Sequence, residues 1–314
     1  MDIVQSNLDM LFRQADLRFG QALAGTPVWS TALATEIPSS SRQITYAWLA
    51  RIPVMRKWLG DRTVHSLSTH SRTVTNEKYE LTDALPVDDV EDDQFGLFNM
   101  NLQFMAAQAA KWKDQMTESF LRNANTIIGY DGKAVFATDH PVNGGDVAGG
   151  PTGTAMSNLR VNTALTYDNY VAERARMMSY VGEDGKPLAV VPNLLVVPPQ
   201  LEGMAKLILE ADFISNIAGN TTASQNNTYK GSAQILVVPE LADKPNNWWL
   251  FDTKKVVKPI IHQIRQNPTF TYLTSPTDSN VFFQDRFVYG CKAKGAAAES
   301  LWFLSLAATS AGTY

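Results

Sequence analysis

The chain has few of the residues that catalysis, metal binding or covalent cross-linking require. Its 314 residues include a single cysteine, Cys291, so no disulfide can form within one molecule, as is usual in a reducing compartment. No apolar run approaches the roughly 20 residues that a membrane-spanning helix needs, and the most apolar stretch, residues 301–308, has the length of a strand. The amino-terminal residues lack the basic and apolar regions of a signal peptide. We therefore expect a soluble intracellular product that does not enter a membrane.

The charge balance argues against a protein that grips nucleic acid. The formal net charge is −4 and the isoelectric point is about 5.6. Proteins that bind DNA tightly usually carry a basic surplus, because lysine and arginine neutralise the phosphates. A mildly acidic chain is still compatible with lying beside DNA without sequence-specific binding. With 45% hydrophobic residues, the chain is large enough to bury a substantial core in one domain or in two closely joined domains.

No recognisable motif for a metal ion, a phosphate or a cofactor is present. His65 and His70 lie on opposite sides of any strand that contains them, and they lack the i, i+4 spacing of a helical zinc pair. The glycine-rich run at residues 144–153 lacks the Gly-Lys-Ser/Thr ending of a P-loop. The acidic run at residues 88–93 lacks the spacing and the central glycine of a calcium loop. We expect no metal and no cofactor.

One dipeptide leaves an enzymatic alternative open. Asp139 precedes His140, and an acid with a histidine is a frequent pair in acid–base catalysis. Adjacent side chains rarely aim at the same atom, however, and no serine or cysteine nucleophile motif accompanies them. A turn in which Asp139 bonds to the backbone is the favoured interpretation, so the chain is predicted not to be an enzyme. An unrecognised hydrolase that uses Asp139 and His140 is the alternative.

Periodicity predicts an amino-terminal helix, a projecting hairpin and a long second helix. Apolar residues recur at helical steps over residues 4–23. Residues 44–49 and 63–67 have strand composition and flank a turn region, so residues 42–80 are expected to form an extended β-hairpin. From residue 88 to residue 123 the apolar residues keep helical spacing, which predicts one continuous helix of roughly 50 Å.

The hairpin and the start of the long helix carry opposite charges. Residues 42–80 hold seven basic and three acidic side chains, while residues 83–93 hold six carboxylates and no basic residue. A projecting hairpin that contains tryptophan and methionine needs a covering surface, and opposite charges set the register of such a contact. We therefore predict an assembly interface between the hairpin of one copy and the helix start of its neighbour. The alternative is that the carboxylates only stabilise the start of the helix, where its dipole favours negative charge, and keep the chain soluble. It consists of Arg51, Met55, Arg56, Lys57 and Trp58 on one side and of Asp88, Asp89, Glu91, Asp92 and Asp93 on the other.

The rest of the chain mixes helices and strands without a clear linker. A helix is predicted at residues 167–180. Two similar strand-then-proline units, at residues 193–199 and 234–240, are expected to pair or lie side by side in one sheet. Strand composition recurs in the last third, at residues 248–251, 256–264, 281–288 and 301–306. This order predicts an α+β fold.

Three segments resemble the Mu-type phage major head proteins, the gpT family. The longest, NEKYELTDALPVDDVEDDQFG at residues 76–96, is similar to a family stretch in which an NK-x-F/Y-E motif precedes EDDQ-Y/F-G. FATDHP at residues 136–141 and LLVVPPQLE at residues 194–202 resemble two further family segments. The similarity extends over most of the chain, whereas residues 220–232 match nothing in the family pattern.

The resemblance implies a Hong Kong 97-type capsid fold. Its expected divisions are an N-terminal arm at residues 1–41, an extended hairpin (E-loop) at 42–80, a peripheral domain at 81–185 with a spine helix at about 88–123, an axial domain at 186–280, and C-terminal strands at 281–314 that return to the peripheral domain.

The resemblance also implies a function. It predicts a major capsid protein whose pentamers and hexamers form an icosahedral head around phage double-stranded DNA, assembled in the cytoplasm of the host bacterium. The expected partners are further copies of the chain, a separate scaffold protein and protease, a portal protein and a decoration protein. The short arm ahead of the body is too small for a built-in scaffold domain. An encapsulin-like compartment shell of the same fold is the alternative.

Overall fold

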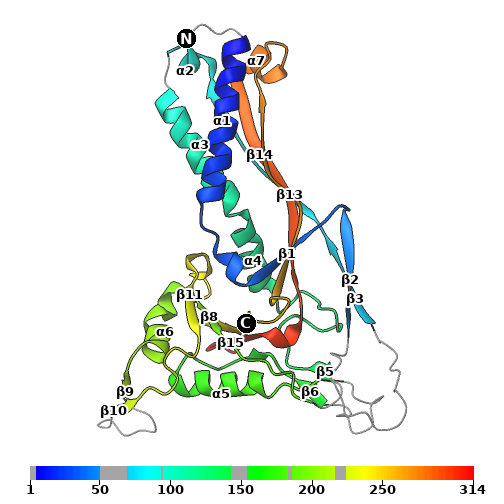
Figure 1. The fold of residues 1–314 in the computed structure, drawn as a ribbon, viewed down its shortest axis with the longest axis vertical. Helices are drawn as coiled ribbons and strands as arrows, with labels where there is room; N and C mark the ends of the chain where they lie inside the picture. The colour runs from blue at the N-terminus through cyan, green and yellow to red at the C-terminus, as the bar shows by residue number, and fades with distance from the viewer. Residues whose placement is uncertain (1–4, 50–68, 93–94, 143–153, 183–185, 216–223) are drawn as a thin grey trace.

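The structure is a computed structural model that describes residues 5–49, 69–92, 95–142, 154–182, 186–215 and 224–314. These residues form an elongated molecule with an upper part built on a four-stranded sheet and a lower part built on a five-stranded sheet (Figure 1). A two-stranded hairpin leaves one side of the molecule. The mixture of helices and strands confirms the predicted α+β class.

The upper sheet has the strand order β1-β13-β14-β4. Its strands are β1 (Ala34–Pro38), β13 (Ile260–Leu273), β14 (Arg286–Glu299) and β4 (Glu77–Pro86). β1 runs parallel to β13, whereas β14 is antiparallel to both of its neighbours, β13 and β4. Because β13 and β14 each have 14 residues, this sheet runs along most of the upper part.

A short helix joins β13 to β14, so the strand predicted at residues 281–288 is wrong over its first half. Helix α7 (Ser279–Gln284) occupies that half, and β14 begins only at Arg286. The buried side chain of Asn280 donates hydrogen bonds to the carbonyls of Leu273 and Arg286, at 3.2 and 2.9 Å. These bonds hold the two strand ends together across the helix, which strand composition alone does not reveal.

Two helices cover one face of the upper sheet. Helix α1 (Gln5–Gly25) confirms the predicted amino-terminal helix, and it packs on α3 (Phe95–Ala110) and β13. Its buried residues recur at steps of three and four: Leu8, Phe12, Ala15 and Phe19. The Phe12 ring stacks on Tyr272 with ring centroids 4.8 Å apart. The segment predicted as an arm, residues 1–41, thus has its helix packed on its own chain, and its β1 strand joins its own sheet.

The predicted continuous helix at residues 88–123 is wrong. The structure has three helices there, α2 (Val87–Glu91), α3 and α4 (Trp112–Asn123), and residues 93–94 lie outside the described ranges. α3 and α4 meet at Lys111, whose ψ of −1° departs from the helical value. The interruption is confined to this residue, because the N–H of Lys111 still donates to the carbonyl of Ala107 at 3.3 Å and that of Gln115 donates to the carbonyl of Lys111 at 3.0 Å. The two segments have different neighbours: α3 packs on α1, whereas α4 packs on β14 and on η1 (Trp29–Ala32).

The lower sheet has the order β11-β8-β12-β15-β7. Its strands are β11 (Gln234–Val237), β8 (Leu194–Val197), β12 (Asn247–Phe251), β15 (Ser305–Thr309) and β7 (Leu159–Arg160). β8 and β11 pair in parallel, which confirms the predicted relation between the two strand-then-proline units. β8, β12 and β15 are buried at every position, as befits strands covered on both faces.

Helices and short segments surround the lower sheet. Helix α5 (Tyr167–Met178) confirms the helix predicted at residues 167–180. The other elements are η2 (Pro199–Leu201), α6 (Glu202–Leu209), η3 (Pro239–Leu241), η4 (Trp302–Leu304) and the strands β5 (His140–Val142), β6 (Thr154–Met156), β9 (Phe213–Ser215) and β10 (Ser224–Asn226).

The chain passes between the two parts more often than the predicted division implies. β13 begins within residues 186–280 yet belongs to the upper sheet, and β15 lies within residues 281–314 yet belongs to the lower sheet. β7 and α5 fall within residues 81–185 and lie in the lower part. Strand pairing, and not chain order, decides the membership of each sheet.

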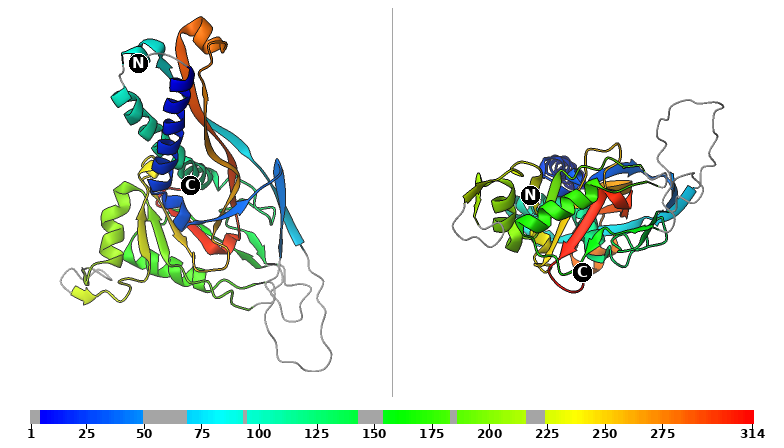
Figure 2. Two further views of the ribbon diagram at one scale, coloured as in Figure 1. Left: turned by 45° about the horizontal axis from the view of Figure 1, so that its top comes forward. Right: turned by 90° about the horizontal axis from the view of Figure 1, so that it is seen from below.

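The predicted hairpin is confirmed at its base. β2 (Gln43–Leu49) pairs antiparallel with β3 (Thr69–Thr75), in a register that runs from Gln43 opposite Thr75 to Leu49 opposite Thr69. The paired strands diverge from the upper sheet (Figures 1 and 2). Residues 50–68, which join them and include the predicted return strand at 63–67, lie outside the described ranges.

Candidate functional site

Six of the ten residues of the predicted assembly interface lie outside the described residues. Arg51, Met55, Arg56, Lys57 and Trp58 fall within residues 50–68, and Asp93 falls within residues 93–94. Asp88, Asp89 and Asp92 are described, and Glu91 is placed as the last residue of α2. The pairing of the two charged groups therefore stays a prediction.

The acidic cluster lies at the top of the molecule in Figure 1. Asp88 and Asp89 occupy the first turn of α2, and Asp88 and Asp92 are exposed. Val90, on the same helix, is 1% exposed and packs in the upper core, so its burial fixes the direction in which the carboxylates point. The backbone N–H of Val87 donates to the carbonyl of Asp285 at 3.2 Å, which ties α2 to the end of α7.

The base of the hairpin is fastened to the body by specific polar contacts. The Tyr46 hydroxyl on β2 donates to Oε1 of Gln263 on β13 at 2.9 Å. Nε2 of Gln263 donates to the carbonyl of Val74 on β3 at 3.3 Å. Val74 is buried against Ala296 and Ala298 of β14. These contacts fix where the hairpin leaves the sheet.

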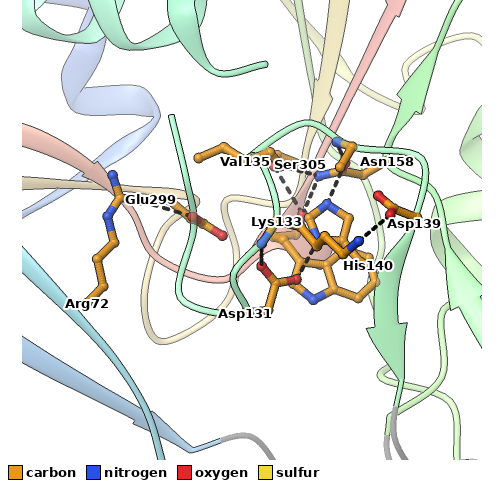
Figure 3. A network of polar contacts seen from close by, with 11 residues as sticks. Arg72, Asp131, Lys133, Val135, Asp139, His140, Asn158, Glu299 and Ser305 are labelled. Atoms are coloured by element: carbon orange, nitrogen blue, oxygen red, sulfur yellow. Dashed lines mark hydrogen bonds and ion pairs between the residues drawn. The ribbon is translucent and has the colours of Figure 1, made fainter. Parts of the chain in front are cut away.

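An ion pair completes this attachment. Nη1 of Arg72, on β3, lies 3.1 Å from Oε2 of Glu299, at the end of β14 (Figure 3). The Glu299 side chain is 2% exposed, and its other oxygen has no hydrogen-bond partner among the described residues. Burial raises the pKa of Glu299 to about 8; the charge of Arg72 opposes this rise, and the nearby charge of Asp131 adds to it.

A second polar network surrounds His140, close to this ion pair (Figure 3). His140 is fully buried, with Nδ1 at 2.6 Å from Oδ2 of Asp131 and Nε2 at 2.9 Å from Oδ1 of Asn158. Asn158 Oδ1 also accepts from the N–H of Ala137, and its Nδ2 donates to the carbonyls of Val135 and Trp302. Burial opposes ionisation of Asp131, but the hydrogen bond and charge of His140 outweigh it, so the pKa of Asp131 is lowered.

This geometry gives the enzymatic alternative no support. Asp139 does not face His140; it forms an ion pair with Lys133 near the surface. Both nitrogens of the His140 ring are already engaged, by Asp131 and Asn158, so neither is free to take a proton from a nucleophile. The network is therefore organised as a structural tie between the loop at residues 129–141 and the lower core.

The described residues contain neither a candidate metal site nor a candidate membrane-spanning helix. No three His, Cys, Asp or Glu side chains among them gather closely enough to hold a metal ion. Within the same ranges, no helix has both the length and the apolar character needed to cross a membrane. Cys291 is buried in β14, and burial raises the pKa of its thiol.

The sequence did not single out the residues that hold the hairpin base. In the sequence, Arg72 is one of the seven basic residues at 42–80, and Glu299 belongs to no motif. A usable signal existed, because Glu299 is an isolated carboxylate in the otherwise uncharged run GAAAESLWF. A lone charge in such a run is rarely buried without a partner. The partner itself is 227 residues away in the chain.

One family model and two known relatives match this chain over nearly its whole length. A family model described as the Mu-like prophage major head subunit gpT matches residues 8–163, 153–241 and 240–313. The Mu-like prophage FluMu major head subunit of Haemophilus influenzae is 24% identical over 284 residues, which cover 90% of this chain and 67% of that protein. The major capsid protein of Escherichia phage Mu is 23% identical over 289 residues, covering 92% of this chain and 69% of that protein.

Solved structures show the same fold. The procapsid of bacteriophage JBD30 matches with a TM-score of 0.62 at 25% identity, over 98% of this chain and 76% of that chain. The virus-like particle of Pyrococcus furiosus matches with a TM-score of 0.54 at 7% identity, over 94% and 98% of the two chains, and at this identity the likeness concerns the fold alone. These likenesses to capsid shells confirm the expected Hong Kong 97-type fold.

Proposed function

Because this chain belongs to the family of Mu-like prophage major head subunits, we propose that its copies assemble as pentamers and hexamers into an icosahedral phage head. The observation that carries the proposal is the family match, which runs from residue 8 to residue 313 and so includes both sheets and the hairpin. A shell-building role is what the family description and both relatives' names state. The encapsulin-like compartment shares the fold, but the family match favours the phage head.

The hairpin is the proposed contact element. In this proposal Arg51, Met55, Arg56, Lys57 and Trp58 of one copy lie over Asp88, Asp89, Glu91, Asp92 and Asp93 of its neighbour. Two observations support it: the hairpin strands leave the body, and the side chains of Asp88 and Asp92 are exposed without an ion-pair partner in the described part of the chain. Each exposed pair contributes at most about 1 kcal/mol, so the apolar residues dominate the affinity and the charges set the register.

Charge reversal tests this contact. Arg56→Glu with Lys57→Glu is expected to lower the yield of shells while leaving the monomer folded, as judged by electron microscopy and thermal unfolding. A compensating variant that also carries Asp88→Lys and Asp92→Lys restores opposite charges and is expected to regain part of the yield. Shells at the wild-type yield from the first variant would rule out the pairing.

Further partners follow from the same proposal. A scaffold protein, a protease and a portal protein would act during assembly in the host cytoplasm, and the finished shell would hold double-stranded DNA. The net charge of −4 supports contact with DNA that is neither tight nor sequence-specific, because a tight grip needs a basic surplus. A capsid of bacteriophage JBD30, similar in fold, is decorated with minor capsid protein trimers, and a decoration protein is proposed here too. The proposed role requires no cofactor, no membrane and no catalytic residue.

A further inference from the structure

The face of the upper sheet that points away from α1 and α3 carries a group of cations. Next to the hairpin base this face holds four basic side chains: Lys78 of β4, Arg265 of β13, and Lys292 and Lys294 of β14. The residues that alternate with them in β14, Cys291 and Ala293, are buried towards the helices. Three of the four basic side chains are exposed, and that of Lys294 is half-buried. These four residues are termed the sheet cluster.

The arrangement of the sheet cluster is unfavourable in a single chain. Lys78 and Lys294 are direct cross-strand partners, and like charges in that position destabilise a sheet. The pKa of Lys294 is lowered, first by desolvation and then by the like charges of the other three residues. Glu80 lies opposite Lys292 but accepts a hydrogen bond from the Thr82 hydroxyl at 2.5 Å. Within the described ranges none of the four cations has an ion-pair partner, so the cluster is suited to an anionic partner from outside.

The same chain carries carboxylates that its own sheet cluster cannot reach. The tip of the molecule consists of α2, with Asp88, Asp89 and Asp92, and of the neighbouring helix α7 (Figure 1). β4 separates the tip from the cluster, because Lys78 lies eight residues before Pro86, or about 26 Å at the rise of a strand. Lys292 pairs with β4 about 20 Å below the same point. Both separations exceed the reach of two side chains and the screening length of about 8 Å.

Each of the two surfaces also has an apolar part. At the tip, Phe282 and Phe283 of α7 are 74% and 78% exposed. On the sheet, a hollow of about 350 Å³ adjoins the cluster at Lys292 and is lined in part by Leu273 and Val288. Exposed apolar groups rimmed by charge are typical of protein interfaces. They favour a protein partner over DNA, whose phosphate backbone offers no apolar group to such a hollow.

We propose that the tip of one copy docks on the sheet cluster and the hollow of a second copy. In this contact Asp88, Asp89 and Asp92 face the lysines and set the register, while Phe282 and Phe283 supply apolar contact. Because the two surfaces differ, each copy offers its tip to one neighbour and its sheet to another, as in a ring of subunits. The six carboxylates at residues 83–93 outnumber the three cations of the proposed hairpin contact, so one tip can serve both contacts. The use of this contact in a shell rests on the function proposed above, whereas the contact itself does not.

Carbodiimide cross-linking of mixed copies tests the proposal. The reagent joins a lysine amine to a carboxylate without a spacer, so only groups in contact react. Unlabelled and ¹⁵N-labelled full chains are mixed before assembly, and mass spectrometry identifies links between peptides of different label. Links from Lys292 or Lys294 to Asp88, Asp89 or Asp92 are expected in mixed-label form, because these lysines lie about 20 Å or more from the tip of their own chain.

Charge reversal gives the matched comparison. Lys292→Glu with Lys294→Glu is expected to abolish these links and to lower the yield of shells about fivefold, since the tip then meets like charges. Arg18→Glu with Lys254→Glu changes the net charge equally at two exposed sites outside the sheet cluster, and it is expected to leave the links and the yield unchanged. Thermal unfolding shows whether each variant is folded, and the links of the wild type do not depend on the variants.

The outcomes separate this contact from the shell function. Wild-type shells without mixed-label links at Lys292 and Lys294 overturn the proposal and leave the shell function intact, whereas these links in a chain that forms no shell support the contact alone. A dispersed chain without any mixed-label link overturns the contact as well. A short DNA duplex that binds the wild-type chain but not the Lys292→Glu, Lys294→Glu variant, again without links at these lysines, would assign the sheet cluster to DNA instead.

Discussion

The imidazole of His140 lies flat against the indole of Trp302, with ring centroids 4.5 Å apart and planes 3° apart. The stack joins the loop at residues 129–141 to η4, just before β15, and Asp131 and Asn158 hold the ring at its two nitrogens. A histidine that stacks on a tryptophan and is hydrogen-bonded at both nitrogens is a packing element. Substitution of His140 should therefore lower the free energy of unfolding, and no catalytic activity should depend on this residue.

His140→Ala is predicted to lower the free energy of unfolding by about 2–4 kcal/mol, because it opens a cavity beside Trp302 and leaves Asp131 and Asn158 without their shared partner. Denaturant unfolding of the purified chain measures the loss. Asp139→Ala is the matched control: it removes only a near-surface ion pair with Lys133 and should cost at most about 1 kcal/mol. Equal losses from the two substitutions would contradict the structural role assigned to His140.

Gly295 is predicted to tolerate no side chain. A Cβ atom there would lie 2.7 Å from the carbonyl oxygen of Gln263 and 2.8 Å from the Trp112 ring of α4. Gly295→Ala should therefore destabilise the chain by roughly 1–3 kcal/mol, since the helix must shift away from β14. Gly20→Ala, in α1 where the added methyl meets open space, should instead stabilise by up to about 1 kcal/mol. Opposite signs in thermal unfolding are the expected result, and a neutral Gly295→Ala would show that α4 does not rest on β14 as described.

His262 is predicted to produce an acid-sensitive step in stability. Its Nε2 lies 2.7 Å from the Thr117 hydroxyl, which itself donates to the carbonyl of Lys113, and its Nδ1 has no partner among the described residues. Burial lowers the pKa of His262 to about 4 from 6.5, so the unfolded chain takes up this proton more readily than the folded chain.

The contribution of His262 is therefore complete above pH 6.5 and is lost as the pH falls from 6.5 to 4, by about 3 kcal/mol in total. His262→Gln keeps a donor for Thr117 but does not titrate. The difference in unfolding free energy between wild type and variant should shrink or change sign across this interval, because other acidic groups titrate equally in both. A difference that is constant from pH 7 to pH 4 would refute the assignment.

The sequence pattern correctly predicted those helices and strands whose buried residues are the same residues that form the pattern. The stripe of α1 places Leu8 and Phe12 in the core, and the strand-then-proline pattern places β8 beside β11. In both cases the same residues that carry the pattern also make the contacts. The hairpin predicted at residues 42–80 belongs to this class as well, because its strands β2 and β3 are neighbours in the chain.

The missed features depend on groups that are distant in the chain. The helix is interrupted at Lys111, where its two halves meet different neighbours, and α7 replaces a strand where Asn280 bridges two strand ends. The apolar stripe across Lys111 is unbroken, so nothing in the local pattern marks the interruption. The partnership of Arg72 with Glu299 spans 227 residues, and a count of charges along the chain cannot identify it.

The shell-forming role itself is tested most directly by electron microscopy of the purified full chain, produced with and without the scaffold gene of its phage. A capsid subunit with this fold is expected to give rings, tubes or closed shells in at least one of the two preparations, and the curvature of these particles would report the angle between subunits. A folded monomer or dimer that stays dispersed in both preparations would contradict the assignment.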